Sequence, residues 1–451
     1  MSLTKVSYSM IQGAVANVLD YGAYSDGTNA AATTAAFVAA LATGKTVFIP
    51  QGTFLINNAL QLQDGQKVFG AGSSRTIINC DQTSFTGIFF SMGGHTSISN
   101  LALAGINGTT ATGIKCWDST NQYNFTGYIS LQDVNISGFF YGLFVNNIFL
   151  LDYQIGLIQN NIRGISIDPT YSASYDSGYA TTLTFYKLDI ITNQYGIDAN
   201  PTIVSKNIVF RDCGIEQNTT DRQVYLQNCD PLTFENCYFE GNSTIPALLL
   251  VSCNTFIEQC YFNGTGGVNL GSGSNSLRAN EFYGTTATDA INGTGTSIQD
   301  VHIYNSQLGA NTVLNITRIH LYYSRIGSTT YYNLNKNLGL TLTSDTLGAN
   351  TTLITDSIAY TKTVSATINA NTSTALITDQ AASNIWSNGF TTAIANISNA
   401  YNPGLILTVT PATTGNANYF CVIATNTTAS PITLTNAALK VLFLSGSGMA
   451  I

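Results

Sequence analysis

One heptapeptide decides the fold, and it reads Phe210-Arg211-Asp212-Cys213-Gly214-Ile215-Glu216. Related segments follow it, with starts 24, 23, 20 and 21 residues apart, at Phe234, Ile257, Leu277 and Ile298. The same pattern occurs upstream in residues 98–104 and 131–137, with longer intervals. A repeat of this length without strict identity predicts one coil of a parallel β-helix per repeat.

Within each segment, the first and sixth residues are mostly large and apolar, as Phe210 and Ile215 are, whereas the second and seventh are mostly polar. The gap of five between the apolar residues is too long for simple alternation and does not match an amphipathic helix. We therefore expect two short strands joined by a bend. Because parallel crossovers are nearly always right-handed, the sequence predicts an all-β, right-handed, single-stranded parallel β-helix.

The cysteines support this stacking. Cys213, Cys237 and Cys260 fall in one column, and Cys229 and Cys253 fall in a second. Stacked strands lie about 4.8 Å apart, and this spacing does not exclude disulfides. We nevertheless expect the cysteines to be reduced and to act as small buried residues. No Cys or His pair has close ligand spacing, so we predict neither a metal site nor a cofactor.

Composition narrows the function. Charged residues make up 9% of the chain, against roughly 25% in an ordinary soluble domain. The net charge of -8 argues against nucleic acid, which needs clustered cations. We expect no secretory signal at the N-terminus and no membrane span, because no apolar run is long enough. The surface is polar without being ionic, which suits sugar hydroxyls.

Two further regions flank the repeats. Residues 1–60 contain an Ala-rich helix, which we expect to cap the open end of the β-helix that continues through residues 61–335. After a linker at residues 336–362, residues 363–451 hold two charged side chains and alternate like antiparallel strands. We interpret this last region as a β-sandwich for homotrimer formation, because an uncharged surface favours burial. A carbohydrate-binding module is the alternative.

The N-terminal stretch carries a family resemblance, through Val6-Ser7-Tyr8-Ser9-Met10-Ile11, Asn17-Val18-Leu19-Asp20-Tyr21-Gly22-Ala23 and Ser25-Asp26-Gly27. It resembles the opening of bacteriophage tailspike and capsule-depolymerase chains with a pectate-lyase-like β-helix. That family commonly has an acidic Asp-Asp-Thr run after the Asp-Gly pair, where this chain has Asn29-Ala30-Ala31-Ala32-Thr33.

The resemblance implies a homotrimer on the virion that binds bacterial capsular or O-antigen polysaccharide and contacts other phage tail proteins. Family members usually carry an N-terminal particle-anchoring domain, whereas this chain begins almost at the β-helix motif. We therefore expect either a fragment or a spike that docks through a short peptide.

Paired carboxylates are the catalytic candidates, because glycosidic hydrolysis needs a proton donor and a nucleophile or base. Glu216 and Glu240 hold the same outward position on successive coils, so their backbones should lie about 4.8 Å apart. Close like charges raise the pKa of one carboxyl. Asp212 is either an accessory acid or part of a corner hydrogen-bond ladder. The alternative reading of the pair is two solvated glutamates that coincide with the repeat by chance.

Substrate-binding candidates fall into three sets. The column of paired glutamates continues, in this alignment, through Asn263, Tyr283 and Tyr304. A second outward column, for which structural ion pairs are the favoured interpretation, includes Glu235, Glu258 and Arg278. A long insertion, of a length that is often functional, contains Tyr175 and Asp176, although it fits packing between protomers equally well.

Three functions stay open. The first is an endo-acting polysaccharide hydrolase. The second is a lyase, which needs a cation beside a proton-abstracting base and would draw on Arg278, His302, His320 and Tyr304. The third is a receptor-binding spike without catalysis, which would bind the polymer and leave its length unchanged.

Overall fold

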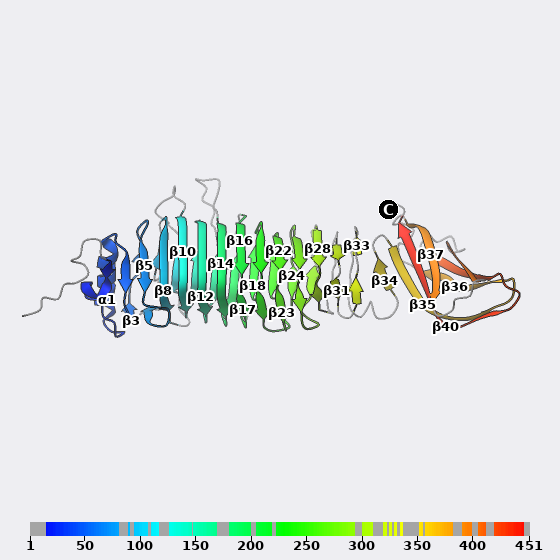
Figure 1. Cartoon of the computed structure of the whole chain (residues 1–451), viewed down its shortest axis with the longest axis horizontal. Helices are drawn as coiled ribbons and strands as arrows, with labels where there is room; N and C mark the ends of the chain where they lie inside the picture. Colours follow the sequence, from blue (N-terminus) through cyan, green and yellow to red (C-terminus); the bar gives the residue numbers. More distant parts are fainter. Residues whose placement is uncertain are drawn as a thin grey trace, which may run out of the picture. The chain divides into compact units, whose positions relative to one another are not determined.

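A computed structural model shows the architecture of the chain (Figure 1). The chain divides into two compact units, residues 1–316 with 323–330 and residues 317–322 with 331–451. The structure describes residues 15–80, 89–90, 94–106, 110–116, 126–146, 148–168, 180–199, 204–218, 222–293, 300–309, 319–322, 324–326, 329–331, 334–336, 351–354, 357–381, 390–398, 405–411 and 419–445.

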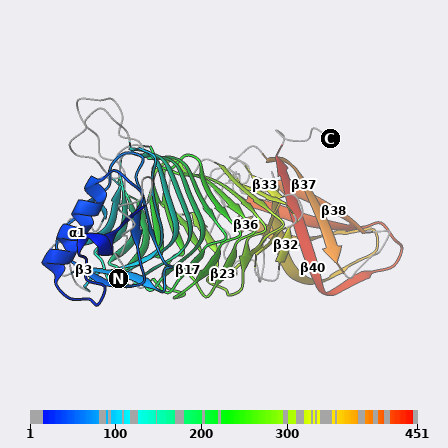
Figure 2. The same cartoon turned by 60° about the vertical axis from the view of Figure 1, so that its left-hand side comes forward.

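The first unit is a parallel β-helix, as predicted, in which strands from successive coils lie side by side (Figures 1 and 2). In the larger sheet, the strands that lead into the corner or run through it are β1 (Ala16–Asn17), β2 (Val47–Ile49), β5 (Lys67–Gly70), β8 (Thr96–Ala104), β10 (Thr126–Ser137), β12 (Ile148–Gln159), β14 (Thr181–Ile191), β16 (Lys206–Arg211), β19 (Leu232–Glu235), β22 (Asn254–Glu258), β25 (Ser276–Asn280) and β28 (Asp300–Tyr304). Its other strands include β3 (Gly52–Ile56), β6 (Thr76–Cys80), β17 (Gly214–Glu216), β20 (Tyr238–Glu240), β23 (Tyr261–Asn263), β26 (Tyr283–Gly284), β29 (Gln307–Leu308), β31 (Ser324–Ile326) and β32 (Thr329–Tyr331).

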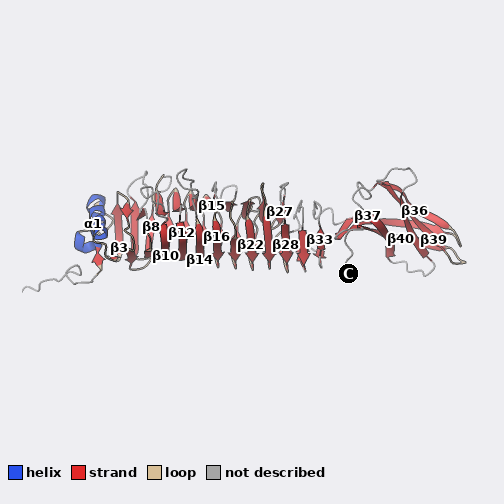
Figure 3. Ribbon diagram, turned by 90° about the horizontal axis from the view of Figure 1, so that it is seen from above, coloured by secondary structure: helices blue, strands red, loops and turns tan. Residues whose placement is uncertain are grey.

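A second parallel sheet forms another wall of the same coils. It consists of β4 (Leu60–Gln61), β7 (Phe89–Phe90), β9 (Thr112–Cys116), β11 (Tyr141–Val145), β13 (Arg163–Ile167), β15 (Tyr195–Ala199), β18 (Val224–Gln227), β21 (Leu248–Val251), β24 (Val268–Leu270) and β27 (Ile291–Gly293). Figure 3 shows the strands of the coils arranged in rows, with the single α-helix of the described residues at the N-terminal end of the unit.

The predicted bend between two short strands is confirmed. One residue per coil adopts a left-handed backbone conformation at this corner, and these residues stack in register. They are Asn100, Asp133, Ile155, Lys187, Asp212, Asn236, Gln259, Glu281 and Asn305. Asn and Asp tolerate this conformation better than most residues, which explains why polar side chains dominate the corner.

The interior of the coil is filled by ladders of like residues. Phe185, Phe210 and Phe234 stack with ring centroids 4.6 and 5.2 Å apart. Seven cysteines are buried and free, as expected: Cys80, Cys116, Cys213, Cys229, Cys237, Cys253 and Cys260. Burial raises the pKa of the Cys116 thiol to about 12, so this thiol stays protonated.

A buried amide ladder adds hydrogen bonds between coils. Asn161 donates to Asn193 over 2.9 Å, and Asn193 donates to Asn218 over 3.1 Å. Each side chain also donates to a backbone carbonyl. The ladder therefore satisfies amides that burial would otherwise leave without partners.

The predicted capping helix is present as α1 (Ala30–Ala42), after a 3-10 turn η2 (Val18–Tyr21). The Asn29 side chain accepts a hydrogen bond from the Ala32 backbone N–H, which caps the helix. Phe37 is buried against Phe54 of β3 with ring centroids 5.6 Å apart. The helix thus covers the apolar interior of the first coils.

The second unit is built from antiparallel strands, as the alternating sequence indicated. One sheet contains β34 (Thr351–Ile354), β35 (Ser357–Ile368), β40 (Ile432–Ser445) and β37 (Phe390–Ser398), and the other contains β36 (Ser373–Ala381), β39 (Tyr419–Asn426) and β38 (Leu405–Pro411). Strands β30 (Ile319–Tyr322) and β33 (Leu334–Lys336) also pair antiparallel. The sandwich arrangement, the trimer and the boundaries at residues 60, 335 and 362 stay predictions.

Candidate functional site

Three carboxylates meet on the outward face of the larger sheet. Glu216 of β17 pairs in register with Glu240 of β20, as predicted. Asp189 of β14 pairs with Gly214. A Cβ atom added to Gly214 would lie 3.0 Å from Glu216 Oε1 and 3.1 Å from Asp189 Oδ1. The absence of a side chain at Gly214 therefore leaves the space that these two carboxylates occupy.

Electrostatics distinguish Glu216 from its neighbours. Partial burial raises the pKa of the Glu216 carboxyl, and the nearby charges of Glu240 and Asp189 raise it further. This is the pattern expected of like charges that share a site, where one carboxyl keeps its proton to higher pH. Glu216 is accordingly the residue of the three best suited to donate a proton.

Glu240 is held by hydrogen bonds. The Tyr238 hydroxyl donates to Glu240 Oε2 over 2.7 Å, and this contact raises the pKa of Tyr238. Asn263 Nδ2 donates to the Tyr238 oxygen over 3.1 Å, and the Thr285 hydroxyl donates to Asn263 Oδ1 over 3.0 Å. The chain of contacts fixes the orientation of the Glu240 carboxylate, which suits it to act as base or nucleophile.

An aromatic column extends from the carboxylates along the coils. The column starts at Gly214 and continues on successive coils through Tyr238, Tyr261 and Tyr283, each of which pairs in register with the one before it. The rings of Tyr238 and Tyr261 stack with centroids 5.6 Å apart. Tyr261 and Tyr283 are 43% and 42% exposed, an exposure that leaves both rings accessible to a ligand. Exposed, aligned rings beside carboxylates form a surface on which sugar rings can stack.

The predicted columns are wrong beyond Asn263, by two residues in the coil of Tyr283 and by five in the coil of Tyr304. Tyr283 pairs with Tyr261, not with Asn263. Tyr304 pairs with Asn280, which pairs in turn with Glu258. These two tyrosines therefore do not continue the column of Glu216 and Glu240.

Arg278 is displaced by the same shift of two residues as Tyr283. It pairs with Phe256 and with His302, so it lies outside the column of Glu235 and Glu258. Its guanidinium lies 5.9 Å from the centre of the Phe256 ring. The cause of the shift is that Ala279, a small buried residue, occupies the inward position that the sequence pattern assigned to Leu277.

The second outward column contains structural contacts. Arg211 pairs with Glu235 through Nη2 at 2.7 Å and Nε at 2.8 Å. Asn280 Nδ2 donates to Glu258 Oε2 over 3.3 Å. At the corner, Asn236 Nδ2 donates to Asp212 Oδ1 over 2.5 Å. Asp212 is therefore a member of the corner ladder, and its role as an accessory acid stays a prediction.

Asp189 was not identified from the sequence. A strand of eleven residues carries it through the corner, so its segment does not have the spacing of the later repeats. Its place becomes visible only in the structure, where superposing the left-handed corner residues Lys187 and Asp212 aligns Ile191 with Glu216. Tyr175 and Asp176 lie outside the described residues.

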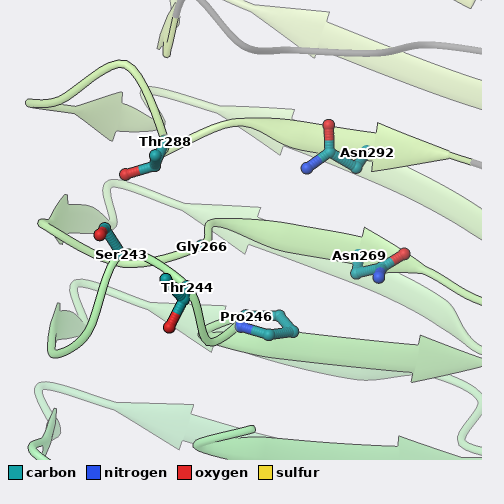
Figure 4. A pocket seen from close by; sticks show the side chains of 7 residues that line it. All are labelled: Ser243, Thr244, Pro246, Gly266, Asn269, Thr288 and Asn292. Atoms are coloured by element: carbon teal, nitrogen blue, oxygen red, sulfur yellow. The ribbon is translucent and has the colours of Figure 1, made fainter. Parts of the chain in front are cut away.

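Two hollows accompany the carboxylates on the β-helix. One, of about 280 Å³, lies beside β21, β24 and β27 and has an uncharged lining of Ser243, Thr244, Pro246, Gly266, Asn269, Thr288 and Asn292 (Figure 4). Asn269 and Asn292 pair in register on successive strands. The other, of about 400 Å³, lies on β5, β8 and β10. A lining of hydroxyl and amide groups fits a sugar better than an apolar ligand.

A cluster on the ten-stranded sheet pairs opposite charges. Arg163 forms an ion pair with the buried Asp198, and its guanidinium lies 6.0 and 5.3 Å from the ring centres of Tyr141 and Tyr195. Because the charges neutralise each other, we interpret the cluster as structural. In the part of the chain that the structure describes, no group of three or more His, Cys, Asp or Glu residues is arranged to hold a metal ion.

The comparisons define the class of protein. A family model described as rhamnogalacturonase A/epimerase, pectate lyase-like matches residues 15–242, and the chain belongs to this family. Its fold is shared with two phage tailspikes. The tailspike gp61 of Pseudomonas phage phi297 aligns with a TM-score of 0.50 and 12% identity, over 95% of this chain and 98% of that one.

The tailspike protein gp49 of Pseudomonas phage LKA1 aligns with a TM-score of 0.50 and 11% identity, over 95% of this chain and 99% of that one. At this identity the likeness concerns the fold alone. No curated protein sequence matches significantly. Among the described residues, no helix has the length and apolar character needed to span a bilayer.

Proposed function

We propose that the protein is a phage tailspike that binds bacterial capsular or O-antigen polysaccharide and cuts it by endo-glycosidic hydrolysis. The observation that carries the proposal is the cluster of Glu216 with Asp189, which meets it beside Gly214, and with Glu240, which pairs with it on the next coil; in this cluster the Glu216 carboxyl has a raised pKa. Family membership and the tailspike-like fold support it.

In the proposed reaction, protonated Glu216 donates its proton to the glycosidic oxygen as the bond to the anomeric carbon breaks. Glu240, oriented by Tyr238, attacks the anomeric carbon or activates a water molecule that does so. Asp189 contributes negative charge that keeps the proton on Glu216 and stabilises the positive charge that develops on the sugar. The exposed rings of Tyr261 and Tyr283 hold the neighbouring sugar units.

A lyase is the second candidate, because one cluster offers the parts that β-elimination needs. Arg278 of β25 pairs with His302 of β28, and His302 Nδ1 lies 3.1 Å from the Tyr304 hydroxyl. The arginine would neutralise a uronate carboxylate, and the His302–Tyr304 pair would abstract the α-proton.

Product chemistry separates the candidates. The protein is incubated with a panel of purified capsular and O-antigen polysaccharides, and polymer length, reducing ends and unsaturated uronate absorbance are followed. Hydrolysis predicts new reducing ends without the ultraviolet absorbance of an unsaturated uronate. New absorbance would favour the lyase, whereas tight binding without shortening would identify a receptor-binding spike and overturn the catalytic proposal.

We also propose a homotrimer on the virion in contact with other phage tail proteins. Support comes from the composition of residues 363–451, in which Asp379 and Lys440 are the only charged side chains. A surface with so little charge favours burial against other subunits. Light scattering that gives three times the chain mass would agree with the proposal, and a monomer mass would contradict it.

A further inference from the structure

The hollow of about 400 Å³ on the larger sheet is chemically unlike the carboxylate cluster. It lies on the early strands β5, β8 and β10, whereas the carboxylates lie on β14, β17 and β20. Its lining residues are Lys67, His95, Thr96, Ser97, Ile98, Ser99, Tyr128, Ser130 and Gln132. Its volume falls within the range of roughly 300–1,000 Å³ that is usual for small-ligand sites.

The floor of this hollow is a regular array of hydroxyl groups. Lys67, Ser97 and Ser130 pair in register on successive strands. Ser99 and Gln132 pair in register two residues further on, and therefore on the same face. Hydroxyl and amide groups spaced by one coil offer hydrogen bonds to the hydroxyls of a sugar ring.

The rim supplies positive charge and an aromatic ring. Lys67 and His95 are exposed, and Tyr128 is 37% exposed. His95 has a left-handed backbone with φ of 60°, which is uncommon for a residue with a side chain. The imidazole lies beside Gly127, where a Cβ atom would be 3.9 Å from His95 Cε1.

Carboxylates flank the hollow without lining it. Asp152 continues the column of Lys67, Ser97 and Ser130 on β12, where its Oδ2 accepts a hydrogen bond from Gln154 over 2.7 Å. Asp64 Oδ1 lies close to Gly94, where a Cβ atom would be 3.0 Å away. The lining itself contains two basic side chains, Lys67 and His95, and no carboxylate.

We propose that this hollow binds an acidic sugar residue, with Lys67 and His95 facing its carboxylate and Tyr128 stacking on its ring. Lysine recognises such an anion as a point charge, and the contact is a charge-assisted hydrogen bond. The uncharged hollow formed by Ser243, Asn269 and their neighbours offers no such charge. The inference rests on the proposed function for the ligand being a glycan, but it does not require that the glycan be cut.

Ligand-observed NMR on the full chain tests the inference with three sugar acids, D-glucuronate, D-galacturonate and N-acetylneuraminate, and with methyl glucoside as the neutral probe. We expect at least one acid to bind more tightly than the neutral sugar. Lys67→Gln should weaken that acid roughly tenfold, and added salt should weaken it in the wild type. Lys206→Gln, which removes an equal charge from the exposed start of β16, is the matched control and should bind like the wild type.

Two results would overturn the inference: no sugar acid binds better than methyl glucoside, or Lys67→Gln and Lys206→Gln bind alike. Tyr128→Ala is a second variant, and it should weaken acid binding without a change in the salt dependence. The carboxylate variant Glu216→Gln separates this site from the proposed catalytic site. It should bind the sugar acid normally. Polymer shortening therefore reports on the proposed catalysis, whereas binding of the sugar acid reports on this inference.

Discussion

Glu216 and Glu240 occupy paired positions on β17 and β20, and Glu216 also approaches Asp189 over the space that Gly214 leaves by having no side chain. The pKa of Glu216 is raised by its own partial burial and by the charges of Glu240 and Asp189. The stacking of the coils produces this proximity, because residues at equivalent positions are separated by one strand spacing of about 4.8 Å.

Replacing Glu216 by Gln should raise the thermal unfolding midpoint at neutral pH. The folded chain holds the Glu216 proton to higher pH than the unfolded chain, in which the pKa is near 4.5. The stability that this group contributes is therefore complete below that value and is lost as pH rises through the raised folded pKa. The gain in the variant should disappear in acid below about pH 4.5. A lower midpoint for the variant at neutral pH would contradict the assigned burial and charge.

Gly214→Ala should abolish most catalytic activity while the β-helix persists. The new methyl group would lie 3.0 Å from Glu216 Oε1 and 3.1 Å from Asp189 Oδ1, so both carboxylates would have to move. Small displacements of catalytic groups cost large factors in rate. Initial rates on a cleaved polysaccharide and the circular dichroism spectrum measure the two effects. Wild-type activity in this variant would show that the space at Gly214 is not required.

Tyr261→Ala should weaken polymer binding and leave the fold intact, because the ring is 43% exposed. We expect a loss of about 0.5–1.5 kcal/mol of binding free energy, the usual contribution of an aromatic stacking contact. Tyr261→Phe retains the ring and is the matched control. Affinity for an uncleaved polymer, measured in the Glu216→Gln background, reports the effect, and equal affinities for the Ala and Phe variants would exclude stacking.

Asn193→Ala should destabilise the β-helix. Its amide bridges Asn161 and Asn218 inside the coils and also donates to two backbone carbonyls. Each buried partner left without a hydrogen bond costs about 1–3 kcal/mol. Gln61→Ala, at an exposed position of β4, should leave the unfolding midpoint nearly unchanged. Equal midpoints for the two variants would contradict a stabilising ladder.

The sequence predicted the coil because inward apolar residues recur with the coil length, and stacking enforces that recurrence. It failed to predict the register after Asn263, where Ala279 takes the inward place assigned to Leu277. A shift of two residues keeps every side chain on its own face, so the pattern of polar and apolar residues cannot detect it. The columns can be aligned correctly only by superposing the left-handed corner residues, which backbone geometry alone reveals.

Part of the candidate site could be predicted from the sequence. Glu216 and Glu240 lie in consecutive coils of nearly equal length, so counting residues aligned them correctly. Asp189 lies in a coil with a longer strand, and its approach to Glu216 depends on the missing side chain of Gly214. Proximity of this kind arises from three-dimensional packing and has no fixed spacing in the sequence.

Polymer length gives the most direct test of the carboxylate cluster. Wild-type protein, Glu216→Gln, Glu240→Gln and Asp189→Asn are each incubated with a polysaccharide that the wild type shortens, and chain length is followed by size-exclusion chromatography. We expect Glu216→Gln and Glu240→Gln to bind the polymer and to shorten it at least a hundredfold more slowly, on the order of what a catalytic acid or base contributes, with a smaller loss for Asp189→Asn. Wild-type shortening by both glutamine variants would contradict the assignment of the site.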